Sequence, residues 1–142
     1  MTLNPQVALS FNGTCEAAFR CYERCLNGTI TFMVTWGNTP SAAEAPADWG
    51  DKIYHATLKV GDIVIMGGDQ PPDRYTPPGG FELVLPMDDP LAAERVFQEL
   101  AAGGTIKMPL QETFWASRFG VLVDRFGVPW TVNCERAEQA AT

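Results

Sequence analysis

Apolar residues recur at helical spacing in two segments of this chain. In each segment they stand at positions i, i+3, i+4 and i+7, which is one face of an amphipathic helix. Both segments then pass through glycine into the same Gly-Thr-Ile triplet, at residues 28–30 and 104–106. Glycine ends helices and β-branched residues favour strands, so each triplet predicts a helix end followed by a strand start. The apolar positions of the two predicted helices are Ala18, Cys21, Tyr22 and Cys25, and Ala93, Val96, Phe97 and Leu100.

Alternating apolar and polar residues predict four strands in each half of the chain. Period-two alternation is typical of a strand with one buried face, and the more apolar face is expected to cover a helix. In the second strand that face would carry Ile30, Phe32 and Val34. The turn at residues 12–14 is expected to supply capping oxygens to the first helix. The predicted strands cover residues 6–11, 29–36, 52–60 and 63–66, then 81–87, 105–109, 119–124 and 128–134.

The repeat predicts an α+β fold built from two βαβββ modules. We expect the eight strands to form a curved mixed sheet around a cleft, with both helices outside it. At 142 residues and 46% hydrophobic content, the chain is long enough for a single domain with a real core. Within this domain, module one covers about 1–69, a linker about 70–79, module two about 80–135 and a polar tail 136–142.

The charge balance disfavours nucleic acid and anionic membranes as partners. The chain has only ten Lys and Arg residues and a formal net charge of −7. No apolar run approaches the roughly 20 residues of a membrane span, and residues 1–10 lack the pattern of a secretion signal. We therefore expect a cytoplasmic protein. The four cysteines include no CxxC pair, so the sequence predicts no disulfide and no metal site, and Cys21 and Cys25 are expected as small buried residues of the helix stripe.

The polar sides of the predicted strands gather hydrogen-bonding side chains from both modules. Polar residues that converge on one sheet face indicate a wet concave cleft, although an open, solvent-exposed sheet is the simpler alternative. The residues on these polar sides are Gln6, His55, Thr57, Glu82, Thr131 and Asn133.

Candidate catalytic chemistry centres on His55, the single histidine, because an imidazole can act as an acid, a base or a ligand. Glu82 and Glu112 are the candidate carboxylates, since a partly buried carboxylate has a raised pKa and can shuttle a proton. Each candidate has a structural alternative, which is a hydrogen-bonded histidine or a solvent-exposed carboxylate. No Ser-His-Asp or Cys-His set can be assembled from the sequence.

Aromatic and cationic side chains complete the predicted ligand contacts. Trp115, in a predicted loop, offers a flat wall for a ligand, whereas Trp130 is expected in the core. Arg118 could pair with Glu112 or hold an anionic ligand, and a structural ion pair is the favoured interpretation. The predicted ligand-binding set is Gln6, His55, Glu82, Trp115, Arg118 and Thr131.

Four longer motifs stand out from the pattern. They are LSFNG at residues 9–13, DKIYHA at 51–56, MPLQETFW at 108–115 and DRFGVPW at 124–130. With the duplicated βαβββ module, they resemble the PhnB-like branch of the vicinal oxygen chelate superfamily. That superfamily includes glyoxalase I, extradiol dioxygenases, fosfomycin-resistance thiol transferases and bleomycin-binding proteins. The resemblance covers nearly the whole chain.

The resemblance also implies where a metal ion would bind. Metal-dependent members place four ligands, usually His and Glu, on the first and last strand of each module. The corresponding positions here are Gln6, Ile65 or Met66, Glu82 and Thr131. Only Glu82 among them is a strong ligand for a hard divalent ion, so we expect no metal and no other cofactor.

Three classes of function stay open, and the sequence does not decide whether the chain is an enzyme. The first is a PhnB-like, glyoxalase-fold protein that binds a small molecule, or acts on one without a cofactor, in a cleft between the modules. The second is a divalent-metal-dependent isomerase, lyase or dioxygenase with non-standard ligands such as His55, Glu82 and Glu112. The third is a bleomycin-resistance-type binding or sequestration protein. We also expect a homodimer, because the segment from Trp36 to Trp49 would expose an apolar surface in a monomer.

Overall fold

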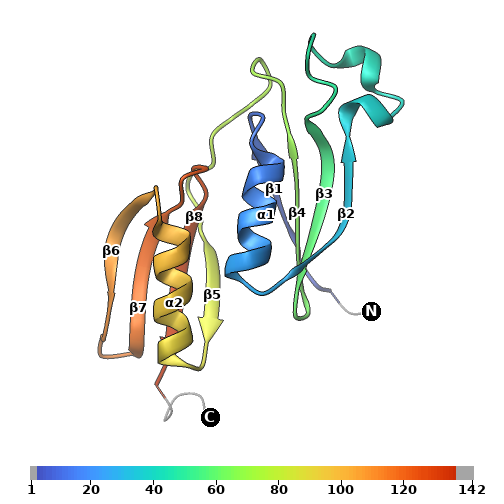
Figure 1. The fold of residues 1–142 in the computed structure, drawn as a ribbon. Coiled ribbons are helices and arrows are strands. Elements are labelled where there is room, and N and C mark those ends of the chain that lie inside the picture. The colour runs from blue at the N-terminus through green and yellow to red at the C-terminus, as the bar shows by residue number, and fades with distance from the viewer. Residues whose placement is uncertain (1–2, 137–142) are drawn as a thin grey trace. The chain divides into compact units, whose positions relative to one another are not determined.

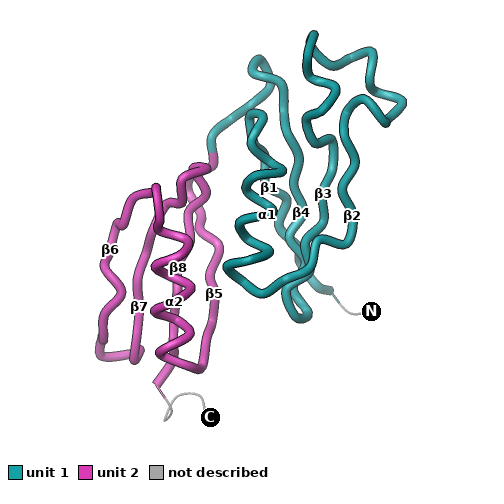
Figure 2. Tube along the Cα trace, in the orientation of Figure 1, with its two compact units in different colours: residues 1–77 teal, residues 78–142 magenta. Residues whose placement is uncertain are grey.

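The chain folds as two βαβββ units, which confirms the organisation predicted from the repeat. The computed structural model describes residues 3–136, so most of the predicted polar tail lies outside the described residues. Contacts divide the chain into Met1–Pro77 and Pro78–Thr142, here called unit 1 and unit 2 (Figure 2). Unit 1 contains β1 (Val7–Phe11), α1 (Cys15–Cys25), β2 (Thr29–Thr35), the 3₁₀ helices η1 (Trp36–Asn38) and η2 (Ala42–Glu44), β3 (Ile53–Val60) and β4 (Ile63–Asp69). Unit 2 contains β5 (Leu83–Met87), α2 (Pro90–Ala101), β6 (Thr105–Gln111), β7 (Ala116–Val123) and β8 (Pro129–Glu135).

Each unit forms a four-stranded mixed sheet, and the two sheets have the same strand order. The order is β1-β4-β3-β2 in unit 1 and β5-β8-β7-β6 in unit 2. The first strand of each unit is parallel to the last, and the other pairs are antiparallel. The predicted strands are therefore hydrogen-bonded as two sheets of four. The helix of each unit lies across one face of its sheet (Figure 1).

Helix α1 buries its predicted apolar stripe against the sheet of unit 1. Phe19 and Tyr22 are fully buried, as are Ala56 and Leu58 on the strand beneath them. Gly67 in β4 permits this close packing, because a Cβ at that position would lie 2.8 Å from the Phe19 ring. Cys21 and Cys25 are buried thiols, as predicted, and so are the other two cysteines. The face that carries Ala56 is therefore the helix-covered face of this sheet.

A bulge in β2 places two side chains on the opposite face of the sheet from the one predicted. Period two places Phe32 on the face of Ile30, but the pairing with β3 shifts register between these residues. Ile30 pairs with Leu58, whereas Phe32 pairs with Thr57, so their side chains lie on opposite faces. The prediction that Phe32 and Val34 cover the helix is wrong, and Phe32 is 52% exposed on the other face.

The carboxylate of Asp69, at the end of β4, joins three separate segments of unit 1. Its Oδ1 accepts hydrogen bonds from the backbone N–H groups of Gly13 and Cys15, both at 2.9 Å. Its Oδ2 accepts one from the N–H of Ile53 at 2.8 Å. Asp69 itself is only 1% exposed. One buried side chain therefore anchors the loop after β1, the start of α1 and the start of β3.

Asp69 also replaces the local cap that the sequence predicts for α1. Thr14, the N-cap residue, makes no side-chain capping bond, so the prediction of a cap from the turn at residues 12–14 is wrong. The nearby thiol of Cys15 is buried, which raises its pKa, and the negative charges of Asp69 and then Glu16 raise it further. The Cys15 side chain is therefore a neutral thiol at physiological pH.

In unit 2, the motif at residues 124–130 builds the turn between β7 and β8. Asp124 Oδ1 accepts hydrogen bonds from the backbone N–H groups of Phe126, at 2.8 Å, and Val128, at 3.0 Å. Its Oδ2 accepts one from Trp130 Nε1 at 2.9 Å. Gly127 adopts a φ of 90°, a conformation that favours glycine. Trp130 is fully buried, which confirms its predicted place in the core.

The tryptophan that begins the expected dimer surface is mostly buried within its own unit. Trp36 is 4% exposed, donates its Nε1–H to the carbonyl oxygen of Asp69 at 3.1 Å, and packs edge-on against Tyr54. Trp36 therefore adds nothing to an exposed apolar surface. The expectation that the Trp36–Trp49 segment would be exposed in a monomer is wrong for this residue. The homodimer itself stays a prediction. Among the described residues, neither long helix has the length and apolar character to span a bilayer.

Candidate functional site

The face of the unit 1 sheet that lies away from α1 carries the single histidine. Cross-strand pairing places Phe32 and Val34 of β2, and Met66 of β4, beside His55 and Thr57 of β3. We call these five residues the His55 face. Thr57 Oγ1 lies 3.2 Å from His55 Nε2, and the Phe32 ring centroid lies 6.0 Å from that of the imidazole. His55 is half-buried, so it has both fixed neighbours and access to solvent.

This geometry prepares His55 for contact with a polar ligand. The Thr57 hydroxyl engages Nε2, and among the described residues Nδ1 makes no hydrogen bond. An imidazole nitrogen can donate or accept a hydrogen bond there. The exposed Phe32 ring beside it offers an apolar contact. Period-two alternation correctly placed His55 and Thr57 on one face, but it missed Phe32.

Three aromatic rings pack together in unit 2, two in the turn between β6 and β7 and one on β7 itself. Thr113 closes this turn, because its N–H donates to the Ala116 carbonyl and its Oγ1 accepts from the Ala116 N–H, both at 3.0 Å. The Trp115 ring packs edge-on against Phe114 at 4.7 Å and against Phe119 at 5.1 Å between centroids. Trp115 lies outside the strands, as predicted. Phe119 is an aromatic neighbour that the sequence did not single out.

Two buried oxygens on β8 have no hydrogen-bond partner among the described residues. They are Thr131 Oγ1 and Asn133 Oδ1. Thr131 pairs with Val121 and Asn133 with Phe119, so both lie on the face away from α2. Buried polar atoms without partners carry a free-energy cost and call for an explanation, such as a bound water or a ligand. Thr131, a predicted ligand contact, is only 4% exposed, so this oxygen is enclosed by its neighbours.

The structure gives Arg118 and Glu112 different partners from the pair considered in the sequence. Arg118 Nε donates to Glu94 Oε1 of α2 at 2.9 Å. Glu112 instead lies 3.5 Å from Arg136 and is largely exposed. Arg118 pairs with Cys134 and follows the regular alternation of Gly120 and Leu122, so it lies on the side of α2, away from the face of the β8 oxygens. The predicted pairing of Arg118 with Glu112 is therefore wrong, and Arg118 forms a structural ion pair with Glu94 instead.

Gln6 and Glu82 lie just outside the strands in which they were predicted. Strand β1 begins at Val7 and β5 begins at Leu83, and both polar residues are exposed. Exposed side chains at strand ends are not fixed by packing in one geometry. The structure therefore brings His55 and Thr57 together, but it does not build a fixed site around Gln6 or Glu82.

The four positions implied by the resemblance do not fit a hard divalent metal. On β4, Met66 lies on the His55 face, whereas Ile65 is 3% exposed on the face covered by α1. The donors would thus be an amide, a thioether, one carboxylate and a buried hydroxyl, a poor set for zinc, nickel, manganese or iron. Across residues 3–136, no group of three or more His, Cys, Asp and Glu side chains is placed to hold a metal ion.

We expect protein purified without a metal-affinity tag to retain well below one equivalent of divalent metal after dialysis. Tight sites need three or four strong ligands in a fixed geometry, and this donor set supplies one carboxylate. Elemental analysis by mass spectrometry measures the metal content directly. One retained equivalent of metal would contradict this expectation, and His55 and Glu82 would then be the first residues to replace.

Comparison with known proteins places the chain in a family. Residues 6–132 match the Glyoxalase/Bleomycin resistance protein/Dioxygenase superfamily. Protein YjdN of Escherichia coli (strain K12) is 37% identical over 141 residues, which cover 94% of this chain and 95% of YjdN. The crystal structure of PA1353 from Pseudomonas aeruginosa is 46% identical with a TM-score of 0.86, and the match covers 94% of this chain and 98% of that one. A PhnB protein from Bacillus cereus, 24% identical with a TM-score of 0.79 over 93% and 99% of the two chains, shares the fold. This chain therefore belongs to the Glyoxalase/Bleomycin resistance protein/Dioxygenase superfamily.

Proposed function

We propose that this protein binds a small molecule on the His55 face and needs no metal to do so. The observation that carries the proposal is the contact between His55 Nε2 and Thr57 Oγ1, next to the exposed Phe32 ring. A hydrogen-bonding imidazole inside an apolar frame is a common arrangement for holding a small ligand in one orientation. If the ligand is a substrate, His55 Nδ1 is the group that would exchange a proton with it.

The chemistry of the His55 face favours a small polar or amphipathic ligand. One imidazole can orient a single polar group, while Phe32, Val34 and Met66 supply apolar contact around it. The family assignment supports this proposal, because the superfamily name joins two kinds of enzyme with a protein of resistance to bleomycin, which is a small molecule. The proposal leaves open whether binding leads to reaction or to sequestration.

Replacing His55 with alanine should weaken binding of the ligand by about two- to tenfold. This range corresponds to the roughly 0.5–1.5 kcal/mol that one hydrogen bond contributes. A mixture of defined metabolites can be screened by native mass spectrometry, and the dissociation constant of the retained compound then measured by calorimetry. Phe32→Ala should weaken binding in the same direction through lost apolar contact.

Glu44→Ala is the matched control for both variants, because Glu44 is exposed in η2 and lies outside the His55 face. It should bind like the wild type. If His55→Ala and Phe32→Ala also bind within twofold of the wild type while remaining folded, the His55 face is not the binding site.

A further inference from the structure

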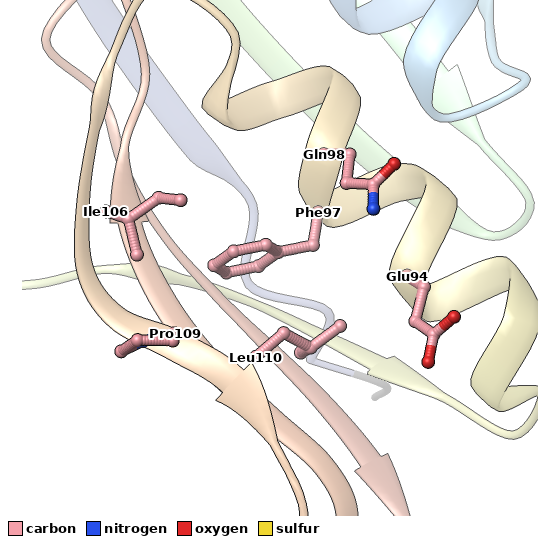
Figure 3. A pocket seen from close by; sticks show the side chains of 6 residues that line it. All are labelled: Glu94, Phe97, Gln98, Ile106, Pro109 and Leu110. Carbon is pink, nitrogen blue, oxygen red and sulfur yellow. The ribbon is translucent and has the colours of Figure 1, made fainter.

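A groove of about 350 Å³ lies between α2 and β6 of unit 2 (Figure 3). Phe97 points from the helix toward the strand, and Ile106 and Leu110 of the strand lie around its ring (Figure 3). The volume falls at the lower end of the roughly 300–1,000 Å³ typical of small-molecule sites. No residue of the His55 face contributes to it. The groove is lined by Glu94, Phe97, Gln98, Ile106, Pro109 and Leu110.

The apolar floor of the groove is fixed by the backbone of β6 and β7. Two register shifts interrupt the pairing of these strands, and such bulges let neighbouring residues lie on the same side. Pro109 and Leu110 both line the groove for this reason. On β7, a Cβ at Gly120 would lie 2.7 Å from the Phe97 ring and 2.9 Å from Leu110 Cα. The floor of the groove is therefore closely packed.

Glu94 places a carboxylate at the rim of this apolar groove. Its Oε1 accepts the hydrogen bond from Arg118 Nε at 2.9 Å, which holds the carboxylate in position. Among the described residues, Oε2 makes no hydrogen bond, and the side chain is 41% exposed. Arg118 donates a second hydrogen bond to the carbonyl oxygen of Ser117 and does not line the groove. A molecule in the groove therefore meets the carboxylate rather than the guanidinium.

We propose that this groove binds a small amphipathic cation, an ammonium group attached to an apolar ring or short chain. The apolar part lies against Phe97, Ile106 and Leu110, and the ammonium group donates to Glu94 Oε2. The ammonium group gains a charge-assisted hydrogen bond to this oxygen that a neutral ligand cannot make, and the carboxylate disfavours an anion at the same place. The formal net charge of −7 adds a general attraction for cations.

Titration of the ¹⁵N-labelled full chain with benzylammonium tests this proposal. We expect dose-dependent shifts at backbone amides of residues 94–98, 106–108, 110 and 111, with a dissociation constant of about 1 mM or tighter. Benzyl alcohol has the same ring without the charge and should bind at least fivefold more weakly, and benzoate weaker still. Equal binding of benzyl alcohol and benzylammonium, or shifts mainly outside these residues, would overturn the proposal.

Three variants separate the carboxylate from the general charge of the helix. E94Q should weaken benzylammonium binding at least fivefold, whereas E99Q should leave it within twofold, because Glu99 pairs with Arg95 and does not line the groove. Q98E adds a second carboxylate at the rim and should strengthen binding, and it tests the proposal even if E94Q is poorly folded. Identical affinities for wild type, E94Q and Q98E would refute the proposal. The His55→Ala variant should bind the probe normally, so failure here is distinguishable from failure of the His55 face.

Discussion

Replacing Asp69 with alanine should lower the free energy of unfolding by about 3–5 kcal/mol. The substitution removes a buried carboxylate that accepts backbone N–H hydrogen bonds from Gly13, Cys15 and Ile53. Hydrogen bonds to a charged acceptor contribute about 1.5–3 kcal/mol each, and a buried donor left without a partner adds a desolvation cost. Water can reach the partly buried amide of Gly13 in the variant, which reduces the total below the simple sum. Urea denaturation followed by circular dichroism measures the change.

Two further variants and one local measurement isolate the cause. Asp69→Asn keeps one acceptor oxygen and should lose less stability than Asp69→Ala. Asp62→Ala is the matched control, because Asp62 is exposed in the turn after β3 and its loss should change stability by less than about 0.5 kcal/mol. Hydrogen exchange should accelerate most at the three amides that Asp69 binds. If Asp69→Ala is as stable as Asp62→Ala, the carboxylate does not hold these segments together.

The repeat, the helices and most strand faces could be predicted because their signals are local. The stripes through Tyr22 and Phe97 each recur within three helical turns, and both residues are buried where the pattern placed them. His55 and Thr57 are two residues apart in one regular strand, so a period-two count placed them correctly. In each case the information lies within a few neighbouring residues of the chain.

The errors arise where a strand changes register or a contact spans a long stretch of chain. Arg118 pairs with Glu94, 24 residues earlier in the chain, rather than with Glu112. In β2, an extra residue moved Phe32 to the His55 face. Alternation alone cannot show where such a bulge falls, because its position depends on the partner strand. The cap of α1 comes from Asp69, 54 residues beyond Cys15, and no local motif marks that contact.

Two of the four motifs that resemble the PhnB-like branch have structural roles in this chain. The segment at residues 124–130 was singled out as one of four motifs, and the structure uses it to build a turn and a buried hydrogen bond. In the segment at residues 108–115, Thr113 closes a turn, and Pro109 and Leu110 line the groove beside α2. A motif can therefore identify a family through residues that specify its fold, while the chemistry lies at other positions.

Replacing Trp130 with alanine should lower the free energy of unfolding by about 3–5 kcal/mol, the usual cost of removing a large buried aromatic side chain. Trp130 is fully buried, and its Nε1–H donates to Asp124 Oδ2 at 2.9 Å. Trp130→Phe keeps most of the apolar volume and removes this hydrogen bond, so it should cost about 2 kcal/mol. Urea denaturation of both variants separates the packing contribution from the hydrogen bond.

Trp49→Phe is the matched control for the hydrogen bond, because the Nε1 atom of Trp49 is buried without a partner among the described residues. Removing an N–H group that makes no hydrogen bond should change stability by no more than about 0.5 kcal/mol. Equal losses in Trp130→Phe and Trp49→Phe would show that the bond to Asp124 does not stabilise the turn. Because Trp130 and Asp124 act on the turn of unit 2, Trp130→Phe should still bind ligand on the His55 face of unit 1 at temperatures where it is folded. That result would separate the residues that specify this fold from those that bind its ligand.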